Sequence, residues 1–128
     1  MTMDEADRQA VHGVRDWYNE IAVEFERRYE GAGGDFWRVF EESLAFELLG
    51  NPGRRILDLG CGPGRLSKSL SQRAPFVLAT DIAIAMVALA QRTKPAPNVH
   101  YCVMDATRLA LKPGTIDEVI SLGMFEYL

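Results

Sequence analysis

The sequence predicts an α/β protein in which two N-terminal helices precede a partial parallel sheet of about four strands. From residue 54 onward, short apolar runs alternate with helical segments at intervals of about 20 to 25 residues, which is typical of βαβ units. The first 50 residues instead repeat their apolar positions at the spacing of amphipathic helices. Right-handed crossovers between parallel strands would then place the later helices on the faces of the sheet.

A first helix is predicted over about residues 5–29, because apolar residues recur there at spacings of three and four. The residues that carry this pattern are Val11, Val14, Tyr18, Ile21 and Phe25.

A second helix follows three glycines that lie between residues 31 and 34, and Asp35 is expected to cap its start. The glycines and proline of residues 50–53 end it. Its apolar residues share one face, and we expect the aromatic ones in the core or in a lid. They are Phe36, Phe40, Leu44 and Leu48, with Trp37 beside them.

Four short apolar runs predict the strands of the sheet, over residues 55–59, 76–80, 99–104 and 116–122. Helices are expected between the first three strands, over residues 65–72 and 82–92. Residues 51–128 are therefore predicted to form a ligand-binding α/β domain, and residues 1–50 a helical cap laid against it.

A glycine-rich turn ends the first strand, where parallel sheets bind their ligands. Gly60, Gly62 and Gly64 stand at alternate positions, and the missing Cβ atoms let the backbone turn sharply and approach a ligand closely. The free N–H groups at the start of the next helix point to the same place. Asp58 precedes the turn, and its carboxylate suits a cationic or amine-bearing ligand better than a pyrophosphate.

Acidic residues also end the second and third strands. Asp81 can accept both hydrogen bonds from a ribose diol. Asp105 could accept a hydrogen bond from an exocyclic amine. Three carboxylates at neighbouring strand ends predict a site for a nucleoside that carries positive charge.

Residues 54–128 resemble the N-terminal half of the class I S-adenosylmethionine (SAM)-dependent methyltransferases. The similar stretches are residues 56–64, 81–86, 105–109 and 113–121, and residues 17–22 are similar to the helix that opens many members. Within the class, the chain is most similar to the small-molecule branch that includes quinone-biosynthesis enzymes. The resemblance implies a Rossmann-like sheet in the order 3-2-1-4, SAM as the cofactor and a small-molecule methyl acceptor.

The resemblance also implies roles for the residues at the first two strand ends. The loop 60–64, which contains Cys61, would pass the methionine part of SAM, with Asp58 near its amine. Asp81 would hold the ribose hydroxyls.

The remaining roles that the resemblance implies concern the adenine and the methyl group. Ile82 and Met86 would lie against the adenine, Asp105 would accept from its amine, and Ala106 would supply a backbone N–H. The residues that would border the sulfonium and the acceptor are Ser121, Leu122 and Gly123, and those that would close over the cofactor are Tyr18 and Tyr29.

Methyl transfer is an in-line displacement from a sulfonium, so the protein mainly aligns the acceptor and excludes water. A general base is needed only if the acceptor must lose a proton, and the sequence identifies no catalytic residue. No His, Cys and Asp residues have the spacing of metal ligands, so no metal is expected.

The composition excludes several other classes of protein. No run approaches 18 apolar residues, so no membrane span is expected. Two cysteines cannot form a disulfide framework, which favours the cytoplasm. Residues 1–50 carry a net charge of −7 and residues 51–128 one of +3, so neither part is basic enough to indicate a nucleic-acid surface.

Two other functions remain open on the sequence: a fragment of an NAD(P)-dependent oxidoreductase, and a non-catalytic module for cofactor binding or interaction. The chain ends just past the fourth strand, whereas a complete fold of the resembled class has seven, so we expect a fragment or one half of a split protein. The fourth strand would then be an exposed apolar edge, through which we expect self-association.

Overall fold

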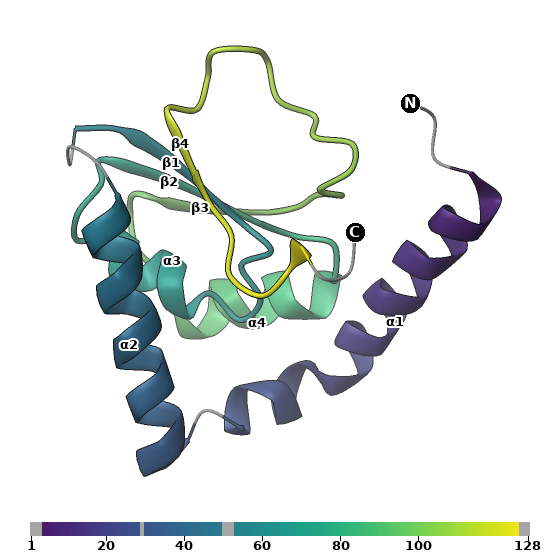
Figure 1. Cartoon of the computed structure of the whole chain (residues 1–128), viewed down its shortest axis with the longest axis horizontal. Helices are drawn as coiled ribbons and strands as arrows, with labels where there is room; N and C mark the ends of the chain where they lie inside the picture. The colour runs from purple at the N-terminus through teal and green to yellow at the C-terminus, as the bar shows by residue number, and fades with distance from the viewer. Residues whose placement is uncertain (1–3, 29, 50–52, 126–128) are drawn as a thin grey trace.

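The computed structural model describes residues 4–28, 30–49 and 53–125. Four parallel strands form one sheet in the order β3-β2-β1-β4, as predicted (Figure 1). The strands are β1 (Arg55–Leu59), β2 (Phe76–Asp81), β3 (Val99–Val103) and β4 (Glu118–Ile120).

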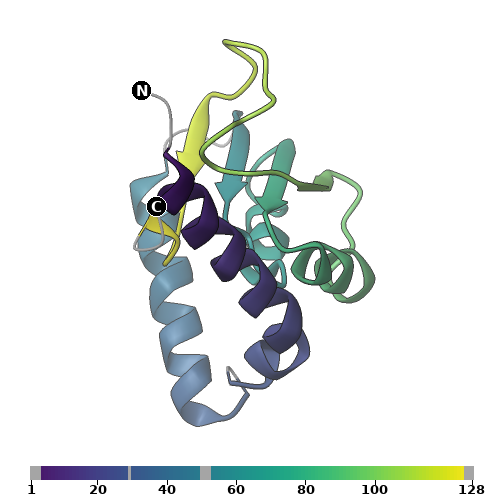
Figure 2. The ribbon, with the colours of Figure 1, turned by 90° about the vertical axis from the view of Figure 1, so that its right-hand side faces the viewer.

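The helices of the described residues are α1 (Glu5–Arg27), α2 (Ala32–Leu48), α3 (Arg65–Leu70) and α4 (Ile84–Thr93). In Figure 1, α3 and α4 lie beneath the sheet and α1 and α2 flank them on opposite sides. Figure 2 shows that the carboxyl ends of the strands point toward the space that α1 and α2 flank. None of these helices is both long enough and apolar enough to cross a membrane.

The main core lies between the sheet and α3. The apolar runs of β1 and β2 are buried because both strands lie inside the sheet. Leu57, Leu70 and Val77 are each at most 1% exposed. Helix α2 joins this core through Phe46 and Leu49, which pack against it at the end nearest the sheet.

Polar contacts fix α1 to α4. The Asn19 side-chain oxygen accepts a hydrogen bond of 2.9 Å from the backbone N–H of Ala85, in the first turn of α4. Glu26 forms an ion pair with Lys94, just beyond the other end of α4. A side chain of α1 therefore supplies the cap that α4 lacks from its own sequence, since Ala83 stands at its N-cap position.

Several predicted boundaries differ from the structure, and three of the differences have a clear physical cause. Helix α2 begins at Ala32, because Gly31 adopts a φ of 92° before it and its carbonyl already accepts from the N–H of Asp35, which lies in the first turn. Helix α4 begins two residues later than predicted, because the Asp81 carboxylate holds the N–H of Ala83 in a turn. Strand β4 has three residues rather than seven, because it pairs with β1 only from Glu118 onward to the point where its backbone turns away.

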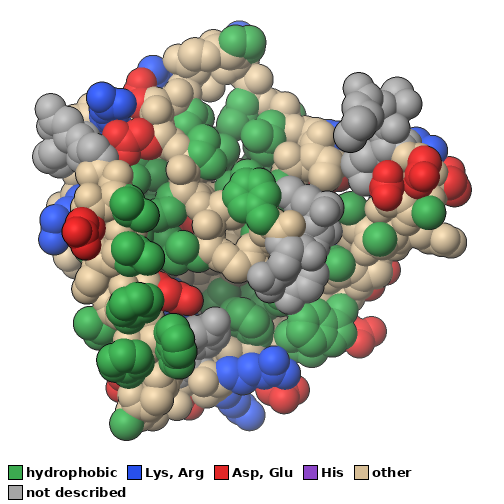
Figure 3. Space-filling model, in the orientation of Figure 1, with side chains coloured by type: hydrophobic (Ala, Val, Ile, Leu, Met, Phe, Trp, Pro, Cys, Tyr) green, Lys and Arg blue, Asp and Glu red, His purple; other side chains and the backbone are tan. Residues whose placement is uncertain are grey.

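The apolar face of α2 is exposed, so of the two predicted places for its aromatic residues, the core or a lid, the core is wrong. Phe36, Trp37 and Phe40 are 65%, 57% and 51% exposed, and Figure 3 shows the hydrophobic side chains of α2 gathered on one surface. The helix contacts the core through its opposite side, where Ala45 is buried.

Candidate functional site

The loop after β1 is held by the neighbouring strand β2. The backbone N–H groups of Gly60 and Cys61 both donate to the carbonyl of Thr80, over 2.8 and 2.9 Å. The N–H of Gly62 donates to the Asp81 carboxylate over 2.9 Å. Each of these contacts ties the loop to the carboxyl end of β2, so the loop and Asp81 form one unit.

The three glycines of the loop all have positive φ, but they make room for different groups. A Cβ on Gly60 would lie 2.8 Å from the Cβ of Met124, and one on Gly64 would lie 2.8 Å from the Tyr101 hydroxyl. A Cβ on Gly62 would meet no atom within 4 Å, so Gly62 alone faces open space. Gly60 and Gly64 therefore allow close packing within the protein, and Gly62 leaves the approach to a ligand open.

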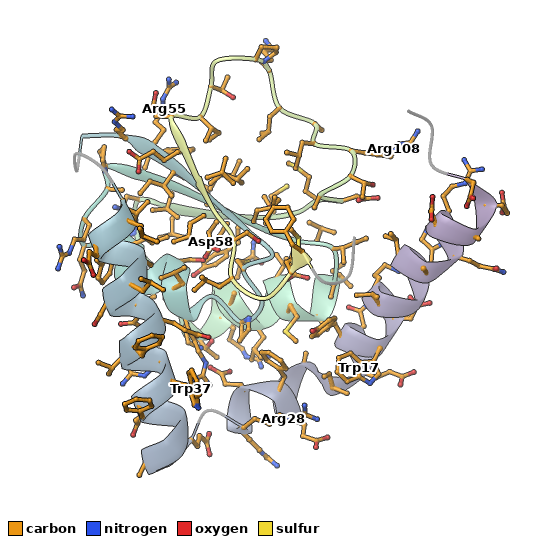
Figure 4. All side chains as sticks on the ribbon, in the orientation of Figure 1. Trp17, Arg28, Trp37, Arg55, Asp58 and Arg108 are labelled. Atoms are coloured by element: carbon orange, nitrogen blue, oxygen red, sulfur yellow. The ribbon has the colours of Figure 1, made fainter. Side chains whose placement is uncertain are left out.

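Asp58 is buried at the carboxyl end of β1, between the sheet and α3 (Figure 4). The Ser67 hydroxyl of α3 donates to its carboxylate over 2.5 Å. Burial raises the pKa of Asp58 to about 6, against the lowering effect of the Ser67 hydrogen bond, and the charge of Asp81 raises it further. A cation that entered the cavity beside Asp58 would favour its charged form.

Asp81 ends β2 and is held by backbone donors on both carboxylate oxygens. Besides Gly62, the N–H of Ala83 donates to it over 2.9 Å. Burial raises its pKa, and the backbone hydrogen bonds partly offset that effect. A carboxylate has about four acceptor positions, so two remain for a ligand.

Asp105 follows β3 and shapes a turn. The backbone N–H and the hydroxyl of Thr107 both donate to the same oxygen of its carboxylate, over 2.8 and 2.7 Å. Asp105 and the adjacent Ala106 are half-buried and face the same cavity as Asp58 and Asp81. The second carboxylate oxygen of Asp105 takes no part in these two hydrogen bonds.

A cavity of about 180 Å³ brings most of the predicted site residues together. It lies at the carboxyl ends of the strands, where α1 and α2 also reach it. The predicted residues that line it are Tyr18, Asp58, Gly60, Cys61, Gly62, Asp81, Ile82, Asp105, Ala106, Leu122 and Gly123.

Four predicted residues are not among those that line the cavity. Met86 is 1% exposed and packs with Ala22 of α1, at the interface between α1 and α4. The Ser121 hydroxyl donates to the carbonyl of Leu59 over 2.8 Å and holds the chain beyond β4 to β1. Gly64 packs against Tyr101 as described above, and Tyr29 lies outside the described residues.

Cys61 lines the cavity, and its surroundings disfavour the thiolate form. Burial raises the pKa of its thiol, and the nearby carboxylates of Asp58 and Asp81 raise it further. The residues described here contain no group of three or more His, Cys, Asp and Glu side chains arranged to hold a metal ion.

Three charged residues of α2 that were not predicted as site residues also line the cavity. Arg38, Glu41 and Glu42 line it, and they share one side of the helix because they are separated by three and four residues. From α1, Val11, Val14 and Phe25 add apolar surface to the cavity. The spacing of Arg38, Glu41 and Glu42 could have predicted that they share one side of α2, away from its aromatic face.

The cavity lies at the carboxyl ends of the strands of a parallel sheet, and comparison with known proteins identifies the family of the chain. Residues 56–128 match the family described as Methyltransferase domain. The chain belongs to this methyltransferase family. The predicted family and the predicted α/β class are thereby confirmed.

Curated relatives of this methyltransferase chain extend beyond it. It is 38% identical over 113 residues to a malonyl-[acyl-carrier protein] O-methyltransferase of Bacillus anthracis, covering 87% of this chain and 41% of the relative. It is 29% identical over 114 residues to a demethylmenaquinone methyltransferase of Beutenbergia cavernae, covering 88% of this chain and 47% of the relative. The chain thus spans less than half the length of these two relatives.

Solved structures share the fold of this methyltransferase chain. Phosphoethanolamine N-methyltransferase 1 of Haemonchus contortus has a TM-score of 0.80 at 21% identity, over 99% of this chain and 28% of that one, which shows the shared fold. Magnesium protoporphyrin IX methyltransferase of Synechocystis PCC 6803, solved with bound SAM, has a TM-score of 0.71 at 26% identity. That match covers 99% of this chain and 65% of the other.

Proposed function

We propose that this chain binds SAM at the carboxyl ends of β1, β2 and β3, and serves the transfer of its methyl group to a small-molecule acceptor. One observation carries the proposal: a single cavity joins the open face of Gly62 to three strand-end carboxylates. The family assignment supports SAM over NAD(P), and so argues against the oxidoreductase alternative.

The residues of the cavity fit SAM chemically. Asp58 would accept from the ammonium group of its methionine part, and the two remaining acceptor positions of Asp81 suit the ribose hydroxyls. The free oxygen of Asp105 suits the adenine amine, with Ile82 against the ring. When bound, SAM supplies an electrophilic methyl group on a sulfonium.

The chain's own contribution to catalysis is alignment and exclusion of water. Leu122 and Gly123 border the cavity beyond β4, and Tyr18 of α1 borders it from the other side. We assign residues 1–50 the role of a cap over the site, because α1 and α2 both line the cavity. We also propose a cytoplasmic setting, supported by two cysteines that form no disulfide.

Self-association through β4 is part of the proposal. This strand lies at the edge of the sheet, and Val119 on it is 57% exposed. Exposed apolar edge strands favour pairing with another chain.

Calorimetric titration with S-adenosylhomocysteine (SAH), the product form of the cofactor, tests the site. Asp81→Ala should weaken SAH binding by about 1–3 kcal/mol, because the ribose hydroxyls lose their acceptor. That corresponds to a dissociation constant roughly 5 to 150 times higher. Asp16→Ala, which changes an exposed acid of α1 that pairs with Arg15, is the control and should bind SAH normally.

Two results would contradict the proposal. One is unchanged SAH affinity in Asp81→Ala, with circular dichroism showing an intact fold. The other is tighter binding of NAD⁺ than of SAH by the unaltered chain, which would restore the oxidoreductase alternative.

A further inference from the structure

The carboxylates that line the cavity differ in what already holds them. Asp58 accepts from Ser67, Asp81 from two backbone N–H groups, and Asp105 from Thr107. Glu42 pairs with Arg38. Glu41, which also lines the cavity, makes no hydrogen bond or ion pair with any residue that the structure describes.

The nearest positive charge on α2 is already shared between two other acids. The Arg38 guanidinium lies 3.5 Å from Asp35 and 3.7 Å from Glu42. Glu41 lies three residues after Arg38, on the same side of α2, and is half-buried. A ligand that brings a charged donor to Glu41 would therefore form a charge-assisted hydrogen bond without displacing a partner among the described residues.

Position separates Glu41 from the carboxylates assigned to the cofactor. Those three stand at the ends of β1, β2 and β3, whereas Glu41 enters the cavity from α2. In Figure 1, α2 flanks one side of the molecule, and the strand ends face the space between it and α1. Glu41 thus borders a part of the cavity that the cofactor assignments leave without a role.

We propose that Glu41 recognises the methyl acceptor, and that it selects acceptors that present a protonated amine over acceptors that present a carboxylate. The inference rests on the proposed function, because it takes the strand-end carboxylates as the cofactor site. A protonated amine offers Glu41 both opposite charge and hydrogen bonds, which is the stronger class of such contacts. A carboxylate in the same place meets like charge and finds no donor on Glu41.

The test uses two probes of the same shape, benzylamine and benzoate, each titrated into the chain saturated with SAH and followed by NMR. The variants are Glu41→Gln, which keeps the size of the side chain and removes its charge, and Glu47→Gln on the exposed surface of the same helix. We expect the unaltered chain to bind benzylamine at least tenfold more tightly than benzoate. Glu41→Gln should abolish this preference and leave SAH affinity within twofold, while Glu47→Gln should change neither.

Each other outcome overturns the inference. Weaker SAH binding in Glu41→Gln would place Glu41 in the cofactor site. Equal effects of Glu41→Gln and Glu47→Gln on the preference for benzylamine would show a general effect of charge. A preference for benzoate, or no binding of either probe, would contradict the specificity assigned to Glu41. Failure of the unaltered chain to bind SAH would instead refute the proposed function, so the two failures are distinguishable. Glu41→Asp, which keeps the charge, should retain part of the preference if Glu41→Gln does not fold.

Discussion

SAH binding should weaken in acid, because Asp58 titrates inside the cavity. Burial raises the pKa of Asp58 to about 6. If only its carboxylate form accepts from the SAH amine, each pH unit below that value lowers the competent fraction about tenfold. The dissociation constant at pH 5 should therefore be about ten times that at pH 7 and above.

Ser67→Ala should move this dependence toward neutral pH. The variant removes the 2.5 Å hydrogen bond that favours the charged form of Asp58. A hydrogen bond to a charged group contributes about 1.5–3 kcal/mol, which corresponds to a rise of about 1 to 2 units in the pKa of Asp58. SAH binding would then begin to weaken between about pH 7 and 8.

The assay is calorimetric titration of SAH between pH 5 and pH 7.5, where the carboxyl group of the ligand stays ionised and its amine stays largely protonated. Titration in buffers of different ionisation enthalpy would also detect the proton that Asp58 releases on binding near pH 6. Asp58→Asn is the control and should bind weakly at every pH. Affinities that do not change with pH in both the unaltered chain and Ser67→Ala would refute the assignment of Asp58 to the amine.

Three further predictions concern stability and association. Without ligand, the raised pKa of Asp58 contributes roughly 3 kcal/mol to the free energy of unfolding below about pH 4, and this contribution is lost as pH rises through about 6. Urea unfolding should show this loss in the unaltered chain and not in Asp58→Asn. Asn19→Ala should lower the free energy of unfolding by about 1 kcal/mol, because α4 loses the hydrogen bond that caps it at Ala85. Hydrogen exchange should rise in α1, and unchanged exchange there would contradict the role of Asn19 in holding α1 to α4. Val119→Lys should shift the chain toward monomer in light scattering, because a charge blunts the edge of β4; a chain that is already monomeric at high concentration would exclude association through this edge.

The parallel sheet was predictable because burial on both faces leaves a continuous apolar run in the sequence. β1 and β2 carry such runs, and each has an acid at or next to its last residue that the structure places in the cavity. β4 was overestimated, because the apolar run there continues through residues that leave the sheet. Just beyond the paired residues of β4, the Ser121 side chain holds the chain to β1 by a hydrogen bond to the Leu59 carbonyl, in place of backbone pairing.

The packing of α2 was less predictable than the sheet, because its sequence pattern does not show which side of the helix contacts the rest of the protein. Its aromatic stripe is the stronger apolar signal, yet Ala45 and Phe46 make the contact. The structure places Met86 away from the cavity for a related reason. Its position in α4 suits either a ligand or a neighbouring helix, and only the docking of α1 on α4 decides between them.

The bond between Asn19 and Ala85 joins residues that are 66 positions apart, and this distance has a consequence during synthesis. The ribosome adds about 5–20 residues per second, so Asn19 is made roughly 3 to 13 s before its partner. During that interval α1 has no α4 to pack on, although its own amphipathic sequence is complete. The apolar face of α1 therefore waits for seconds before the helix that covers it has been made.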